Sequence, residues 1–188
     1  MKRIARTLIV IIPLVSVGIS GPTAIVEAEA IVDPRGIYGS DAELTEIIEY
    51  AIERFDEVGL DLPELRIYVH PAKDGCGGAT CRYGQHGELD RIDLCSQAKF
   101  PYTMLHELAH AWEKHNVPDE VRQDFLAETG LVWYNAQVPW KERGIEAAAE
   151  AIAWGLYEKP LTAEQAAGHA ERLRHFELLT GIQSPRVG

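Results

Sequence analysis

Residues 102–114 read Tyr-Thr-Met-Leu-His-Glu-Leu-Ala-His-Ala-Trp-Glu-Lys, a stretch that predicts a single helix. Thr103 is the expected N-cap of a helix, since Pro101 just before it suits a helix start. The segment Asn116-Val117-Pro118 is expected to end that helix. Apolar residues recur between these limits at steps of three and four, the pattern of an amphipathic helix: Leu105, Leu108, Ala109 and Trp112.

His106 and His110 lie four residues apart, so on this helix their side chains lie on the same face, one turn apart. This spacing allows both imidazoles to bind one Zn²⁺ at metal–nitrogen distances of about 2 Å. Glu107 lies between them, where it can accept a proton from a metal-bound water. The pattern HExxH is the signature of zinc metalloproteases. It supplies two ligands and a base, so a third ligand must come from elsewhere in the chain.

The third ligand is expected from residues 144–156, an alanine-rich segment that predicts a helix. A metzincin would need a histidine where Asn116 stands, so that class is excluded. Glu146 and Glu150 are one turn apart on the predicted helix and share a face. We expect Glu146 to bind the metal and Glu150 to accept the remaining N–H of a ligating histidine. Two alternatives remain open: the two glutamates exchange roles, or both are surface charges.

These two motifs resemble those of the gluzincin zinc metallopeptidases. The segment 146–153, Glu-Ala-Ala-Ala-Glu-Ala-Ile-Ala, is similar to the Glu-x-x-Ala-(Asn/Asp)-x-Phe-Ala element of the small ImmA/IrrE-like members. The resemblance implies that His106, His110 and Glu146 bind Zn²⁺ and that Glu107 is the general base. It also implies that the strand before the HExxH helix edges the cleft and pairs with an extended peptide.

The function expected from these residues is peptide-bond hydrolysis by metal-activated water, with a peptide or protein as substrate. The alternative is a non-catalytic module that contains zinc and binds peptide or cell-envelope material. An oxyanion-stabilising side chain is usual beside the metal, and the sequence offers Tyr157, His115 and Tyr134 without selecting one.

Residues 1–30 have the pattern of a secretory signal peptide, which predicts a secreted or extracytoplasmic protein. Met1-Lys2-Arg3 is basic, residues 8–19 form a mainly apolar region that contains one proline, and Ala28-Glu29-Ala30 fits a cleavage site. The apolar run is short for a membrane span. An uncleaved N-terminal anchor is the alternative. No other segment is expected to contact a membrane.

Composition narrows the choice of partners. The chain of 188 residues has 18 basic and 29 acidic side chains, for a formal net charge of −11. The sequence contains no basic cluster, so we expect no nucleic-acid partner. A monomeric chain is a separate expectation. Two of the three cysteines are expected to pair outside the cytosol. Cys76–Cys95 and Cys81–Cys95 are the competing choices, and Cys76–Cys81 would close only a short loop. A zinc site made of cysteines fits their spacing poorly.

The remaining patterns predict the frame around the two motif helices. Alternating β-branched residues indicate strands at 65–70 and 89–94. Apolar spacing indicates helices from about residue 42 to Gly59, over 119–129, and from Thr162 to about Leu179. We therefore expect residues 31–188 to form one α+β domain of the zincin type. In this domain a short antiparallel sheet packs on the HExxH helix and on the helix that carries Glu146.

Overall fold

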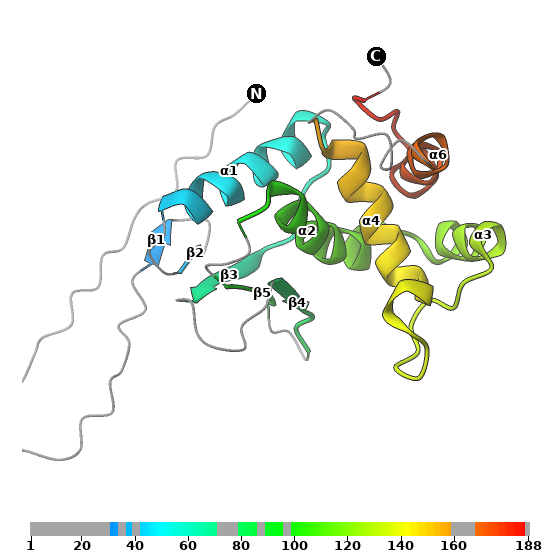
Figure 1. The fold of residues 1–188 in the computed structure, drawn as a ribbon, viewed down its shortest axis with the longest axis horizontal. Coiled ribbons are helices and arrows are strands. Elements are labelled where there is room, and N and C mark those ends of the chain that lie inside the picture. Colours follow the sequence, from blue (N-terminus) through cyan, green and yellow to red (C-terminus); the bar gives the residue numbers. More distant parts are fainter. Residues whose placement is uncertain are drawn as a thin grey trace, which may run out of the picture.

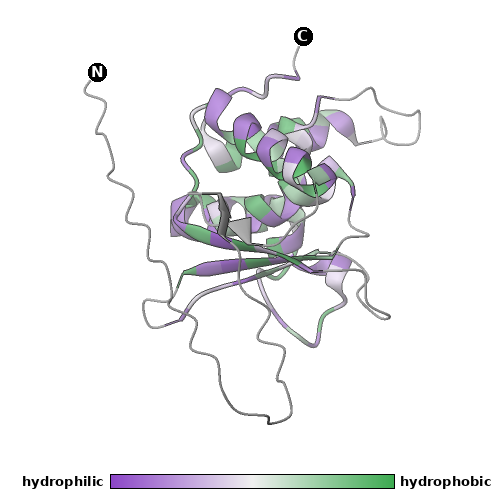
Figure 2. Ribbon diagram, turned by 90° about the vertical axis from the view of Figure 1, so that its left-hand side faces the viewer, coloured by the Kyte–Doolittle hydropathy of each residue, from purple (hydrophilic) through white to green (hydrophobic). Residues whose placement is uncertain are grey.

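The computed structural model describes residues 31–33, 37–38, 42–70, 79–85, 89–95, 99–158 and 168–186. Within them the chain is α+β, as expected, and the helices gather on one face of a small sheet (Figures 1 and 2). The predicted signal peptide, residues 1–30, lies outside the described residues, and both it and the single-domain assignment stay predictions. Among the described helices, none combines the length and apolarity that crossing a bilayer requires.

The sheet is mixed, so the expectation of an antiparallel sheet is wrong. Its order is β1 (Ile31–Asp33), β2 (Ile37–Tyr38), β3 (Leu65–His70), β5 (Asp90–Cys95) and β4 (Ala79–Arg82). Strand β3 runs parallel to β5, whereas β4 is antiparallel to β5. After β3 the chain first forms β4 and then returns between them as β5. The edge strand is therefore β4, and the expectation that residues 89–94 edge the cleft is also wrong.

Five helices of the described residues lie where the pattern predicts them: α1 (Ala42–Glu57), α2 (Pro101–Asn116), α3 (Asp119–Thr129), α4 (Gly144–Leu156) and α6 (His169–Thr180). The start expected for the last one, Thr162, lies outside the described residues. The short 3₁₀ helix η1 (Trp140–Glu142) was not predicted. Helix α2 starts earlier than expected. Pro101 occupies its first turn, and Phe100 is the extended N-cap residue without a side-chain cap. Thr103 is therefore not the N-cap, because the fixed φ of proline already favours the first helical position.

The core lies between the sheet and the helices. Ile67, Ile92 and Leu94 are at most 1% exposed and pack against buried residues of the helix layer. Helix α2 contacts β4 and β5 below it and α1 and α4 beside it (Figure 1). Helix α4 in turn packs on α6, where a Cβ on Gly155 would lie 2.1 Å from the ring of Phe176. The small residues of α4 thus permit its close approach to its neighbours.

Asp90 ties the end of α2 to the sheet. Its carboxylate is 2% exposed and accepts hydrogen bonds from Lys114 Nζ at 2.6 Å, His115 Nε2 at 2.7 Å and the Gly84 amide at 2.7 Å. Burial alone would raise the pKa of Asp90, but these donors outweigh it and lower the pKa. The anchor fixes how α2 sits on β5, and so where its histidines lie.

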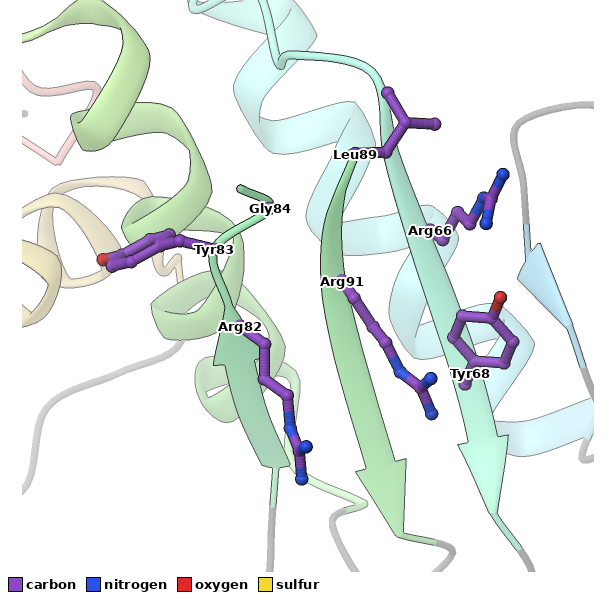
Figure 3. A pocket seen from close by; sticks show the side chains of 7 residues that line it. All are labelled: Arg66, Tyr68, Arg82, Tyr83, Gly84, Leu89 and Arg91. Carbon is purple, nitrogen blue, oxygen red and sulfur yellow. The ribbon is translucent and has the colours of Figure 1, made fainter. Parts of the chain in front are cut away.

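The outer face of the sheet carries a cluster of basic side chains, so the expectation that the chain has none is wrong. Arg66, Arg82 and Arg91 come from three neighbouring strands and line one cavity (Figure 3). They are far apart in the sequence, which is why composition and local charge runs do not reveal them.

Candidate metal centre

Helix α2 presents both histidines of the HExxH motif on one side. The rings of His106 and His110 lie with their centroids 4.7 Å apart, and the two residues are 9% and 7% exposed. The helix ends where expected, with Val117 as an extended C-cap before Pro118. One regular helix of four turns therefore holds the two imidazoles in a fixed relation, as the i and i+4 spacing predicts.

Glu146 completes a group of three potential ligands. The carboxylate reaches across from α4, and its Oε2 lies 3.3 Å from His106 Nε2 and 3.1 Å from His110 Nε2. The ligand atoms of the three residues all lie within 4.8 Å of one another. Ligands bound tetrahedrally at about 2.0–2.1 Å lie about 3.3 Å from each other, so the spacing and the donor set fit Zn²⁺. The structure thus brings together the three residues that the sequence singles out.

Glu150 lies one turn further along α4 and is the next nearest carboxylate. Its Oε2 is 3.8 Å from His106 Nδ1, and its Oε1 is 4.0 Å from Arg172 Nε. It is placed on the far side of the His106 ring from Glu146. This arrangement is consistent with the expected order, in which Glu146 is the ligand and Glu150 orients a histidine.

Glu113 is a partner of the centre that the sequence interpretation did not identify. It lies three residues after His110 on α2 and is 1% exposed. Its Oε1 is 4.0 Å from His110 Nδ1 and accepts a hydrogen bond from the Tyr83 hydroxyl at 3.3 Å. That hydroxyl is also 3.4 Å from His110 Nδ1. The i+3 position relative to His110 was the available signal, but burial of this carboxylate depends on distant residues.

The electrostatics of the group favour a carboxylate beside cationic or metal-bound imidazoles. Burial disfavours the charge of Glu146, but hydrogen bonds with His106 and His110 outweigh burial and lower its pKa to about 2. Burial likewise disfavours the charge of His110, yet Glu113 and Glu146 raise its pKa to about 9. A negative pocket of this kind attracts a cation, and a divalent metal supplies more positive charge than one proton.

Glu107 lies in the same helix but makes a different contact. Its Oε2 accepts a hydrogen bond of 2.6 Å from the backbone amide of Cys81 in β4. Burial is the main influence on this carboxyl and raises its pKa above the usual range. The side chain is therefore held in place by the edge strand, and its raised pKa makes it a stronger base than an ordinary glutamate.

These groups open into a cavity of about 540 Å³ between β4, α2, η1 and α4. Trp140 projects over it, with its ring 6.1 Å from that of His106 and the residue 58% exposed. Tyr102 also lines the wall, whereas none of the three expected oxyanion donors does. Among those donors, His115 is paired with Asp90, and Tyr134 is 64% exposed.

The state of two cysteines limits which of the expected disulfide pairings is possible. Cys81, in β4, is a free thiol that lines the cavity, which is inconsistent with a Cys81–Cys95 bridge. Cys95 is disulfide-bonded. Cys76, the remaining cysteine of the chain, lies outside the described residues.

Comparison with known protein families, with curated proteins and with solved structures gave no match to this chain.

Proposed function

We propose that this protein is a zinc-dependent metallopeptidase of the gluzincin type, HExxH…E. The observation that carries the proposal is the convergence of His106, His110 and Glu146 beside Glu107 at the wall of one cavity. Three protein ligands leave a position open for water, which is the arrangement of catalytic rather than structural zinc sites.

Each of these residues would have one role in the reaction. His106, His110 and Glu146 would hold Zn²⁺, which when bound supplies Lewis acidity to a water molecule and to the scissile carbonyl. Glu107 would accept the proton of that water and later deliver it to the leaving amine. The Cys81 amide keeps the Glu107 carboxylate oriented during both transfers.

The edge strand supports an extended peptide as the substrate. Strand β4 is the last strand in the sheet order and lines the cavity with residues 79–81. A substrate segment would add to its open side through backbone hydrogen bonds. Trp140 would then contact a substrate side chain near the metal ligands.

Secretion is part of the proposal. It is supported by the signal-peptide pattern of residues 1–30. The disulfide at Cys95 also supports it, because disulfides persist in oxidising compartments outside the cytosol.

The test is hydrolysis of quenched fluorescent casein by the zinc-loaded protein and by Glu107→Gln. We expect the variant to keep its zinc and to lose about 10²- to 10⁴-fold in rate, the usual contribution of a general base. Glu120→Gln, an exposed glutamate on α3, is the matched control and should retain full activity. Full activity in Glu107→Gln would contradict the assigned role. Zinc binding without cleavage of any peptide would favour the alternative of a non-catalytic binding module.

A further inference from the structure

Three arginines form a row across the outer face of the sheet. Arg66 of β3 pairs in register with Arg91 of β5, and Arg91 pairs in register with Arg82 of β4. Neighbouring strands lie about 4.8 Å apart, so the row extends over about 10 Å. Figure 3 shows the three side chains on three adjacent strands.

Among the described residues, the positive charge of this row is only partly neutralised. Like charges directly opposite each other destabilise a sheet. Asp93 is the carboxylate that offsets them, at 2.5 Å from Arg91 Nη2 and 3.4 Å from Arg82 Nε. Arg66 is exposed and makes no ion pair with a described residue, and the side chain of Arg82 is 71% exposed. Within the part of the chain that the structure describes, one carboxylate is therefore paired with this row of three guanidinium groups, on a chain of net charge −11.

The surroundings of the row have the shape and chemistry of a binding face. A cavity of about 500 Å³ is lined by the three arginines together with Tyr68, Tyr83 and Leu89. The guanidinium of Arg91 lies 4.1 Å from the centroid of the Tyr68 ring, which holds its plane in one orientation. Leu89 is 39% exposed and adds apolar surface at the same cavity, whereas the ring of Tyr83 points away from the arginines (Figure 3).

We propose that this arginine face binds an acidic peptide segment, whose neighbouring Asp or Glu side chains pair with the row. Guanidinium groups bind carboxylates through two parallel hydrogen bonds, a geometry that a planar fork favours. A short acidic segment would interact electrostatically mainly with the arginines, because charges more than about 8 Å away are screened at physiological salt. A long polyanion such as nucleic acid would also meet the acidic remainder of the chain, which favours the peptide.

The proposal does not depend on the metal centre. Residues that alternate with the row, such as Ile67 and Ile92, face the helices, so the row and the metal ligands lie on opposite sides of the sheet. Loss of hydrolysis would leave binding at the arginine face unchanged, and the two proposals can fail separately.

The test is fluorescence anisotropy at physiological ionic strength with a labelled octapeptide that contains four glutamates, and with its glutamine counterpart. We expect binding of the glutamate peptide alone, and a loss of about threefold to tenfold in affinity for Arg66→Gln and for Arg82→Gln. Arg174→Gln on α6 makes the same change in net charge and should alter the affinity by less than about twofold. Circular dichroism verifies the fold of each variant, and both substituted arginines on the face are exposed.

Three results would overturn the proposal. Equal binding of the glutamine peptide would remove the role of carboxylates, and an equal loss in Arg174→Gln would reduce the effect to net charge. Tighter binding of pyrophosphate or of a short single-stranded oligonucleotide than of the glutamate peptide would assign the face to phosphate groups instead.

Discussion

Helices α1 and α2 have the same length of 16 residues and pack against each other, yet they differ in the number of ionisable side chains that they bury. Helix α1 buries an apolar stripe, and its one buried charge, Arg54, donates to the Leu156 carbonyl and pairs with Glu158. Helix α2 buries four ionisable side chains, namely His106, Glu107, His110 and Glu113. Burying such groups costs folding free energy unless they are well paired. The difference indicates that α1 mainly stabilises the fold, whereas the ionisable side chains of α2 lower the folding stability and form the candidate metal site.

The largest effect on stability is expected in α1. Phe55 is fully buried, and Phe55→Ala should lower the free energy of unfolding by about 3–5 kcal/mol, through lost burial and a residual cavity. Urea denaturation of the metal-free protein measures this. Below the urea transition the variant should bind zinc with the affinity of the wild type. A large change in zinc affinity in the folded variant would contradict the claim that α1 serves stability alone and α2 serves the metal site.

A substitution in α2 should change the zinc affinity and leave the stability of the fold almost unchanged. Glu113→Gln is expected to weaken zinc binding about 10- to 100-fold, because the carboxylate orients His110 through Nδ1. The stability of the metal-free protein should change little, since Glu113 Oε2 is buried without a hydrogen-bond partner and its charge is costly there. Competition with a chelator gives the zinc affinity. Glu120→Gln is the control, and equal affinity in the two variants would refute a positioning role for Glu113.

The smallest effect concerns the anchor between α2 and the sheet. Asp90→Asn should lower the free energy of unfolding by about 1–2 kcal/mol at pH 7, because Lys114 and His115 lose a charged acceptor but stay partly solvated. The pKa of Asp90 is lowered in the folded state, so its stabilisation is complete above the unfolded-state pKa and is lost as pH falls through the folded-state value.

Urea denaturation across the acid range tests this sign. The gap between wild type and Asp90→Asn should be largest at neutral pH and should close in acid below the usual aspartate pKa. A gap that widens in acid would contradict the assignment of Asp90 as the charged acceptor.

The elements that the sequence predicts well are those with a strong local pattern. Strand β3 and helices α3 and α4 have the predicted bounds, because β-branched alternation and apolar steps of three and four are local properties. Glu146 could be singled out because two carboxylates one turn apart are unusual on an alanine-rich helix. The strand after the loop, expected at 89–94, is displaced by a single residue.

What could not be predicted depends on pairing between distant segments. The position of β5 between β3 and β4 follows from how the chain returns after β4, which no local pattern records. Glu113 resembles a polar residue on an ordinary amphipathic helix until Tyr83 of the segment after β4 covers it. The row of Arg66, Arg82 and Arg91 likewise exists only through the register of three strands.

Metal content most directly tests the claim that α2 and α4 form a zinc site. Elemental analysis would be made on protein purified without chelator, for the wild type, Glu146→Ala and Glu150→Ala. The structure predicts one zinc per chain in the wild type, its loss in Glu146→Ala and its retention in Glu150→Ala, since Glu146 alone of the two lies within 3.3 Å of both histidines. Zinc lost only in Glu150→Ala would reverse the roles of the glutamates. A wild type without zinc, even after incubation with the metal, would contradict the account.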